Sequence, residues 1–367
     1  MHIRFLSFCT SAMLSMGALL VAANAIGETT GHRPFQDTVS KNKVEEARFV
    51  TINGMEQWVT IKGNPARPVI LFLHGGPGST MSPYADVLLK DWEKDFLLVQ
   101  WDQRGAGKTY GKMAPEELTP AFLKANPLSI DQLAKDGIAL AEYLIEHLKK
   151  QKIFLFGTSW GSVLGVTIAS RRPDLFYAYV GHSQVVDPRD DRRLYDTVWQ
   201  MAQQKGDTAA LSVLRALGKP PYSRARDVGR LWRVVKKYEA ASSTPPPPGW
   251  FVEAPGYTGT ADSLHRSDGD DYSFVNFVGD QVLGVPAMRA GIQFSVDQLE
   301  FKVPVYLIQG VHDLLTPASV TKAWFNRIKA PAKEYFLLPH AAHGFNQEVL
   351  SKEYNLFMRL SKKLKNP

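Results

Sequence analysis

Runs of consecutive apolar residues alternate with amphipathic segments over much of this chain. Residues 69–73 and 153–156 are unbroken apolar runs, which is typical of strands buried on both faces of a parallel sheet. Between residues 130 and 148 apolar side chains recur at helical spacing, and Ser129 with Gln132 forms a capping box that opens this helix. This alternation predicts an α/β protein whose mostly parallel sheet carries helices on both faces.

A β-hairpin is predicted ahead of this alternation, over residues 47–61. Asn53-Gly54 lies between its two arms, and this dipeptide is a strong hairpin signal because both residues tolerate a positive φ. A final helix is predicted at the C-terminus. Further strands are predicted over residues 95–101, 177–186, 303–308 and 334–338.

The alternation stops between residues 188 and 299. Residues 189–217 and 225–241 have helical patterns, and a loop-rich acidic and aromatic segment follows through Gly279. This stretch is too long for a simple connection, so we predict a mainly helical cap inserted over the strand ends. The predicted organisation is a core in two parts, 47–187 and 300–367, with the cap at 188–299.

The N-terminus has the pattern of a secretory signal peptide. Arg4 precedes an apolar run over residues 5–22, and Ala23-Asn24-Ala25 fits an A-x-A cleavage site. A membrane anchor is the alternative, but the run is interrupted by hydroxyl residues and is short for a spanning helix. We therefore predict a signal peptide over residues 1–25, a tether over 26–46, export to the periplasm or the medium, and no stable membrane insertion after cleavage.

Composition limits the classes of partner. The chain has 367 residues, of which 44% are hydrophobic, and a formal net charge of +7. Its basic residues are scattered rather than gathered into a stripe, which favours a solvated surface over nucleic-acid binding. The single cysteine, Cys9, lies in the predicted signal peptide, so the mature chain is predicted to have no disulfide and no cysteine-based metal site.

The sequence Gly157-Thr158-Ser159-Trp160-Gly161 follows the apolar run at 153–156 and precedes a segment of helical composition. Strand, Gly-x-Ser-x-Gly and helix form the context of a nucleophile elbow. Such a turn exposes the Ser159 hydroxyl at the strand tip and directs the N–H of Trp160 toward the same point, as half of an oxyanion hole. Ser162 is interpreted as part of the helix face behind the elbow.

A second loop supplies the other predicted oxyanion donor. His74-Gly75-Gly76-Pro77-Gly78 follows the strand at 69–73, and its glycines allow the backbone to approach a ligand closely. We expect the second donor to be the N–H of Gly76, with Gly75 next. His74 is interpreted as a structural hydrogen-bonding residue.

An acid and a base follow the last two predicted strands. Asp313 comes after the strand at 303–308, and His343 lies in the loop after the final strand, which gives the chain order Ser…Asp…His. His343 would accept the Ser159 proton, and Asp313 would orient the imidazole and stabilise the imidazolium. His340 is the alternative base and Asp187 the alternative acid.

Two other chemistries are not supported by the sequence. Gly107-Lys108-Thr109 suggests a phosphate loop, but that motif needs glycine where Asp102 stands. Asp102 and Arg104 are instead interpreted as an ion pair that braces the loop. No His/Asp/Glu cluster has convincing metal spacing, so no metal or other cofactor is predicted.

Together these motifs resemble the prolyl aminopeptidase (proline iminopeptidase) family of α/β-hydrolases. The resemblance implies an α/β-hydrolase fold with a helical cap, no metal, and release of an N-terminal residue, usually proline, from short peptides. It also implies Ser159, Asp313 and His343 as the catalytic triad. The residues that carry it are His74 to Gly78, Trp101-Asp102-Gln103-Arg104-Gly105, Gly157 to Ser162, Gly310 to Asp313 and Ala342-His343-Gly344.

The cap departs from the family pattern. Family members tend to carry Trp-x-x-Trp-Glu there, with an acid that helps to hold the substrate ammonium, and this chain lacks the element. An aminopeptidase still needs such a carboxylate, because burying an unpaired ammonium is costly. Gly344, where serine is common, is a smaller departure. The candidate acids are Glu239, Glu253, Asp270 and Asp271.

Three functions are compared. The first is an exported serine aminopeptidase, which takes a short peptide as its substrate. The second is an esterase, lactonase or amidase on the same core, which an apolar cap pocket without a carboxylate near Ser159 would favour. The third, a non-enzymatic binding module, is disfavoured because every catalytic motif is intact. The sequence gives no prediction of the oligomeric state.

Overall fold

The computed structural model describes residues 38–39 and 43–364. The predicted signal peptide, residues 1–25, lies outside the described residues, as does most of the predicted tether. Within the described ranges, no helix has the length and apolar character needed to span a membrane.

One sheet of nine strands organises the described residues, in the order β1-β2-β3-β5-β4-β6-β7-β8-β9. The strands from β5 through β9 in this order pair in parallel, whereas β1, β2, β3 and β5 pair antiparallel. The strands are β1 Thr38–Val39, β2 Val44–Ile52, β3 Met55–Gly63, β4 Val69–Leu73, β5 Leu97–Trp101, β6 Ile153–Thr158, β7 Phe176–His182, β8 Val305–Gly310 and β9 Lys333–Leu338.

The predicted hairpin and buried strands are confirmed. In the hairpin of β2 and β3, Asn53 and Gly54 both have positive φ. Every residue of β4 and β6 is buried, because alternate side chains enter two different apolar clusters. In β6, Ile153 and Leu155 pack on one face and Phe154 and Phe156 on the other.

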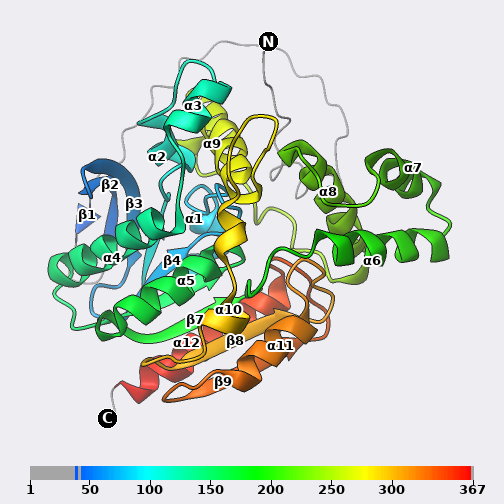
Figure 1. Cartoon of the computed structure of the whole chain (residues 1–367). Helices are drawn as coiled ribbons and strands as arrows, with labels where there is room; N and C mark the ends of the chain where they lie inside the picture. Colours follow the sequence, from blue (N-terminus) through cyan, green and yellow to red (C-terminus); the bar gives the residue numbers. More distant parts are fainter. Residues whose placement is uncertain (1–37, 40–42, 365–367) are drawn as a thin grey trace, which may run out of the picture.

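Helices cover both faces of the sheet (Figure 1). One face packs against α4 (Ile130–His147), α5 (Trp160–Arg171) and α11 (Ala318–Arg327), and the other against α12 (Gln347–Lys363). The predicted capping box is present in part, since the Ser129 side chain accepts the Gln132 N–H at the start of α4. Shorter helices are α1 (Ala85–Leu88), α2 (Gly107–Gly111) and α3 (Pro120–Ala125).

The segment between β7 and β8 is mainly helical, and we call its residues 188–299 the cap. Helices α6, α7 and α8 gather beside the sheet and share an apolar cluster of their own, whereas α9 lies next to α2 (Figure 1). The helices are α6 Asp191–Gln204, α7 Thr208–Leu217, α8 Ala225–Ser242, α9 Thr260–Val278 and α10 Phe294–Asp297.

The prediction of a loop-rich segment through Gly279 is wrong, because most of it forms α9. Its polar residues Asp270, Ser273 and Asn276 are buried, so the helix lacks the polar outer face that reveals a helix in sequence. Long-range contacts replace that pattern: Ser273 Oγ donates to Gly105 O at 2.7 Å, and Asn276 Oδ1 accepts the Leu128 N–H at 2.9 Å.

Candidate active site

Ser159 occupies a sharp turn between β6 and α5. Its φ of +50° is unusual for a residue with a side chain, and such a conformation persists only where the surroundings impose it. Two glycines make the turn possible: a Cβ on Gly161 would lie 1.9 Å from Leu73 O, and one on Gly157 would lie 2.4 Å from Gly161 O. The Ser159 N–H donates to His182 O at 2.9 Å, which fastens the turn to β7.

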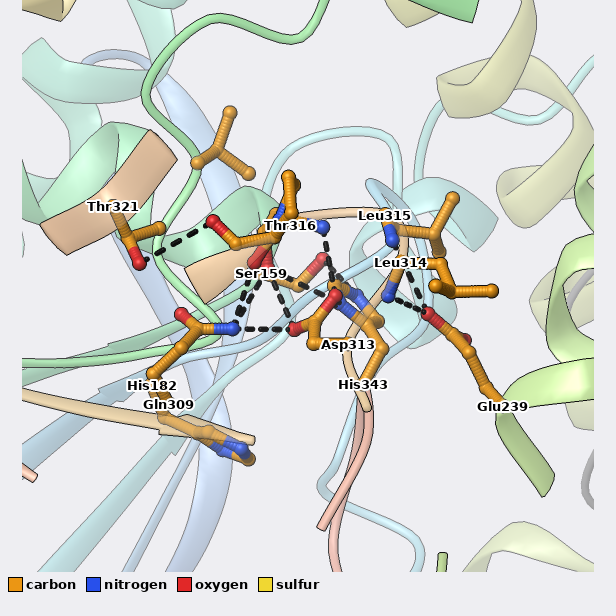
Figure 2. Close-up of polar contacts among 12 residues, drawn as sticks. Ser159, His182, Glu239, Gln309, Asp313, Leu314, Leu315, Thr316, Thr321 and His343 are labelled. Atoms are coloured by element: carbon orange, nitrogen blue, oxygen red, sulfur yellow. Dashed lines mark hydrogen bonds and ion pairs between the residues drawn. The ribbon is translucent and has the colours of Figure 1, made fainter. Parts of the chain in front are cut away.

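The ends of three strands bring Ser159, His343 and Asp313 together (Figure 2). His343 Nε2 lies 2.8 Å from Ser159 Oγ, and His343 Nδ1 lies 3.0 Å from Asp313 Oδ2. Asp313 also accepts the Thr316 N–H at 2.7 Å and the Gln309 side-chain N–H at 2.9 Å. The arrangement is a continuous hydrogen-bonded path from a buried carboxylate through an imidazole to a hydroxyl.

The acid and the base stabilise each other's charged forms. Burial opposes ionisation of Asp313, but the charge of His343 and the hydrogen bonds from His343 and Thr316 hold its pKa below the usual value. Burial also opposes protonation of His343, yet Asp313 keeps the pKa of that imidazole above its usual value. The pair is therefore suited to carry a proton taken from Ser159.

The alternative acid and base lie elsewhere. His340 is exposed, and its backbone N–H donates to Glu348 Oε2 at 3.0 Å. Asp187 pairs with Arg189 at 2.7 Å rather than with a histidine.

Ser162 is buried behind the elbow, where its hydroxyl donates to Ser159 O at 2.6 Å and accepts the Val185 N–H at 2.9 Å.

The loop after β4 comes close to the serine. A Cβ on Gly75 would lie 3.3 Å from Ser159 Cβ. Gly76 has a φ of +110°, and a Cβ there would lie 2.7 Å from the backbone nitrogens of Gly78 and Ser79, so only glycine suits this position. In the hydrogen bonding of the described residues, the N–H groups of Gly76 and Trp160 have no protein acceptor. Gly75, Gly76 and Trp160 all line the cavity that contains Ser159.

Gln103 links the loop after β4 to the elbow around Ser159. The sequence did not predict this role for Gln103. Its side-chain N–H donates to His74 O at 3.1 Å, and its Oε1 accepts the Trp160 indole N–H at 3.0 Å. The Gln103 N–H donates to His74 Nε2 at 3.2 Å. Burial lowers the pKa of His74 to about 4, so this histidine is a neutral structural acceptor. The position of Gln103 within a family motif was the available signal.

The predicted ion pair between Asp102 and Arg104 is wrong. Arg104 Nε donates instead to Asp136 Oδ2 on α4, at 2.7 Å. Asp102 is fully buried and accepts hydrogen bonds from Thr80, from Ser82 Oγ at 2.5 Å and from the Lys108 N–H at 2.9 Å. Neutral donors therefore satisfy this carboxylate, and Arg104 is left to join the loop to α4.

A cavity of about 210 Å³ opens over Ser159 and His343. The core contributes its floor, and the cap contributes much of its wall. The wall is largely apolar, with Val185, Leu194, Trp232, Phe251, Phe277 and Phe345 among its residues. Its charged side chains are Asp187, Asp190, Arg193, Lys236, Arg266 and Asp270.

Of the four acids proposed for a substrate ammonium, only Asp270 lines this cavity. It is buried on α9, and its Oδ1 accepts the Ser79 hydroxyl at 2.9 Å. Glu253 pairs with Arg266 at 2.5 Å. Asp271 is buried away from the cavity, where burial and then the charges of Asp270 and Asp268 raise its pKa to about 8.

Glu239 joins the cap to the triad loop instead. Its Oε1 accepts the N–H groups of Leu314 and Leu315 at 2.7 and 3.1 Å, directly after Asp313 (Figure 2). Burial, followed by the charge of Asp313, raises the pKa of Glu239 to about 7. No local pattern indicates that this acid contacts the loop backbone, because its partners lie 75 and 76 positions away.

No group of three or more His, Cys, Asp or Glu side chains in the described part of the chain could hold a metal ion.

Known proteins resemble this chain in sequence and in fold. The family model for the alpha/beta hydrolase fold matches residues 68–348. A Bacillus subtilis (strain 168) relative named "Probable aminopeptidase YbaC" is 29% identical over 323 residues, which is 83% of this chain and 92% of the relative. A "Probable proline iminopeptidase" of Leptolyngbya boryana is 25% identical over 77% of this chain and 83% of the relative.

A solved structure shares the fold. The proline iminopeptidase of Mycobacterium smegmatis aligns with a TM-score of 0.61 at 16% identity, over 87% of this chain and 98% of the other. The relatives confirm the predicted resemblance to proline iminopeptidases, and the family match confirms the predicted fold. This chain belongs to the alpha/beta-hydrolase family.

Proposed function

We propose that this protein is an exported serine aminopeptidase that releases an N-terminal residue, of the proline type, from short peptides. The observation that carries the proposal is the path from Asp313 through His343 to Ser159, in a cavity that also holds the carboxylate of Asp270. The aminopeptidase names of the relatives support the same activity.

The chemistry follows from the distances. As Ser159 Oγ attacks the substrate carbonyl, His343 Nε2, 2.8 Å away, takes its proton. The N–H groups of Gly76 and Trp160 would donate hydrogen bonds to the carbonyl oxygen as negative charge develops on it, and one such donor typically contributes about 100- to 1,000-fold in rate. His343 then donates the proton to the leaving amine, and an acyl-enzyme remains. In the second half of the reaction His343 takes a proton from water, which attacks the acyl group, and then returns the proton to Ser159.

Asp270 is proposed to bind the substrate's free amine. Its carboxylate is buried beside the glycine loop: a Cβ on Gly78 would lie 2.7 Å from Asp270 Cα. A buried ammonium needs a charged or polar partner, since leaving it unpaired costs several kcal/mol. Asp270 would therefore distinguish a free N-terminus from a blocked one.

The test compares three substrates. Purified residues 26–367 and the Ser159→Ala variant are assayed with proline β-naphthylamide, its N-acetylated form and p-nitrophenyl butyrate. We expect cleavage of the free amine, little cleavage of the acetylated compound and no activity in the variant. Turnover of the ester alone would contradict the aminopeptidase function and leave the serine hydrolase chemistry in place.

Export is the part of the proposal that rests on residues 1–25. The N-terminal pattern of a charged residue, an apolar run and Ala23-Asn24-Ala25 supports it. Mass spectrometry of the protein from a secretion-competent host is expected to give a chain that begins at Ile26. An intact chain that stays in the cell would contradict export.

An esterase or lactonase is the second candidate function. The observation that favours it is the cavity wall, where apolar side chains such as Trp232 and Phe277 outnumber the charged ones. Such a wall would suit an uncharged ester. The same three-substrate assay separates the two functions.

A further inference from the structure

Two cationic side chains of the cap line the cavity above Ser159 and His343. Arg193 comes from the first turn of α6, and Lys236 comes from α8. The proposed mechanism gives neither of them a role. A cation held in a largely apolar wall loses part of its solvation, so the question is which anion compensates it.

Lys236 has no hydrogen bond or ion pair to any other described residue, although it is only partly exposed. Its neighbour Lys237 points elsewhere and pairs with Asp207. The acids that share the cavity with Lys236 have other contacts: Asp187 pairs with Arg189, and Asp190 accepts the backbone N–H at the start of α6. The third acid, Asp270, accepts the Ser79 hydroxyl. The ammonium of Lys236 is therefore available to a ligand.

Arg193 also has donors to spare. Its two terminal nitrogens each lie 3.3 Å from Leu314 O, and its Nε lies 3.4 Å from Asp190 Oδ2. A guanidinium carries five N–H donors, so these long contacts leave part of it unused. Arg193 also lines a neighbouring recess, which places it at the edge of the cavity.

Both cations lie on the His343 side of the site. Lys236 lies three positions before Glu239 on the same helix, and Glu239 accepts the N–H of Leu314, the residue after Asp313. Arg193 contacts the carbonyl of Leu314. In the proposed reaction His343 delivers its proton to the leaving amine, so the leaving residue must occupy this side. Asp270, by contrast, contacts Ser79 in the loop that approaches Ser159 from β4.

We propose that Lys236 and Arg193 form a subsite for the free α-carboxylate of the leaving residue, so that dipeptides are the favoured substrates. The inference rests on the proposed aminopeptidase function. In a dipeptide the carboxylate carbon lies only about 2.5 Å from the leaving nitrogen, as standard bond lengths require. A cation near His343 can therefore reach this carboxylate, whereas a longer peptide carries its carboxylate farther away.

The experiment compares Pro-Ala with its C-terminal amide, Pro-Ala-NH2, which differs by one charge. We expect wild-type kcat/KM to be about tenfold or more higher for Pro-Ala, which is about 1.4 kcal/mol. In Lys236→Met this ratio is expected to fall toward one, mainly through a higher KM for Pro-Ala. Lys237→Met is the matched control, because it removes the same charge from the same helix, away from the cavity, and should keep the wild-type ratio.

Equal kcat/KM for the two peptides in the wild type, or an unchanged ratio in Lys236→Met, would overturn the subsite. A binding measurement separates this result from failure of the proposed function. If neither peptide is hydrolysed, calorimetry on Ser159→Ala decides: tighter binding of Pro-Ala, abolished by Lys236→Met, supports the subsite while the aminopeptidase function fails. Equal binding of both peptides, or no binding, overturns the subsite.

Discussion

The carboxylates of Asp313 in the core and Asp270 in the cap are both buried near the cavity, but different kinds of contact hold them. Asp313 accepts hydrogen bonds from Gln309 and Thr316, which are four and three positions away in the chain. Asp270 accepts one from Ser79, which is 191 positions away. The core acid is positioned largely by its own strand and turn, whereas the cap acid depends on how distant segments pack.

This difference suggests that the core groups carry out the reaction, whereas the cap groups determine which substrate is preferred. The core groups act on whatever carbonyl reaches Ser159, so their loss should affect every substrate equally. In the proposed function the cap groups contact the ends of the substrate, so their loss should change the preference among substrates. Substitutions in the core and in the cap can test that division, and Ser159→Ala is expected to have the largest effect.

Ser159→Ala removes the nucleophile. Loss of a triad serine can cost on the order of 10⁶-fold in kcat in a serine hydrolase, and we expect a loss of this order for peptide and ester substrates alike. Turnover is measured with both substrates, and circular dichroism checks that the fold is retained. Residual activity that differs strongly between the two substrates would break the division between core and cap.

Asp313→Asn keeps the shape of the acid but removes its charge. The His343 imidazole then loses the partner that favours its protonated form, and a comparable substitution costs about 10⁴-fold in kcat. We expect losses of similar size with the ester and with the free-amine substrate. The wild-type pKa of His343 is raised by Asp313, so the acidic limb of any residual activity should move to lower pH. A limb that stays in place would contradict this electrostatic role.

The sequence predicted the core well because its signals are local. The hairpin at Asn53-Gly54, the buried run at 69–73 and the turn around Ser159 each depend on residues within a few positions of one another. The order of strands then brings Asp313 and His343 to the same edge of the sheet as Ser159.

The cap was harder to predict because its signals are long-range. The sequence predicts a loop where α9 forms, since the buried residues of this helix include Asp270 and Asn276 and their partners lie far away in the chain. For the same reason the sequence predicts the wrong partner for Arg104, because its actual partner, Asp136, is 32 positions away. A pattern of apolar positions cannot show which polar groups will meet across such distances.

Asp270→Asn tests selection by the cap. We expect kcat/KM for proline β-naphthylamide to fall about 100-fold, since leaving a buried ammonium without its charged partner costs about 2–5 kcal/mol. The ester rate should change little, because the ester has no ammonium. Asp262→Asn is a matched control on the same helix, where Asp262 pairs with Lys108 at 2.5 Å outside the cavity. Equal losses of activity with both substrates would mean that Asp270 supports the structure of the site and does not bind the substrate amine.

Glu239→Gln is expected to have the smallest effect, and it acts on the contact between cap and core. Glutamine retains an oxygen that can accept the N–H groups of Leu314 and Leu315, now 2.7 and 3.1 Å from Glu239 Oε1. What changes is the charge beside His343, which in the wild type helps to raise the pKa of the imidazole. The variant should therefore move the acidic limb of kcat/KM to lower pH, by less than about one unit.

The pH dependence of stability is a second, independent test of Glu239→Gln. The pKa of Glu239 is raised from 4.5 to about 7 in the folded chain, so the unfolded state loses this proton first as the pH rises. The contribution of Glu239 is most favourable below pH 4.5, and it is lost as the pH rises to about 7. Thermal unfolding at pH 5 and pH 8 should thus show a smaller difference in Tm in Glu239→Gln than in the wild type. An unchanged difference, with an unmoved acidic limb, would mean that Glu239 holds the Asp313 loop only as a hydrogen-bond acceptor and that its charge does not reach the triad.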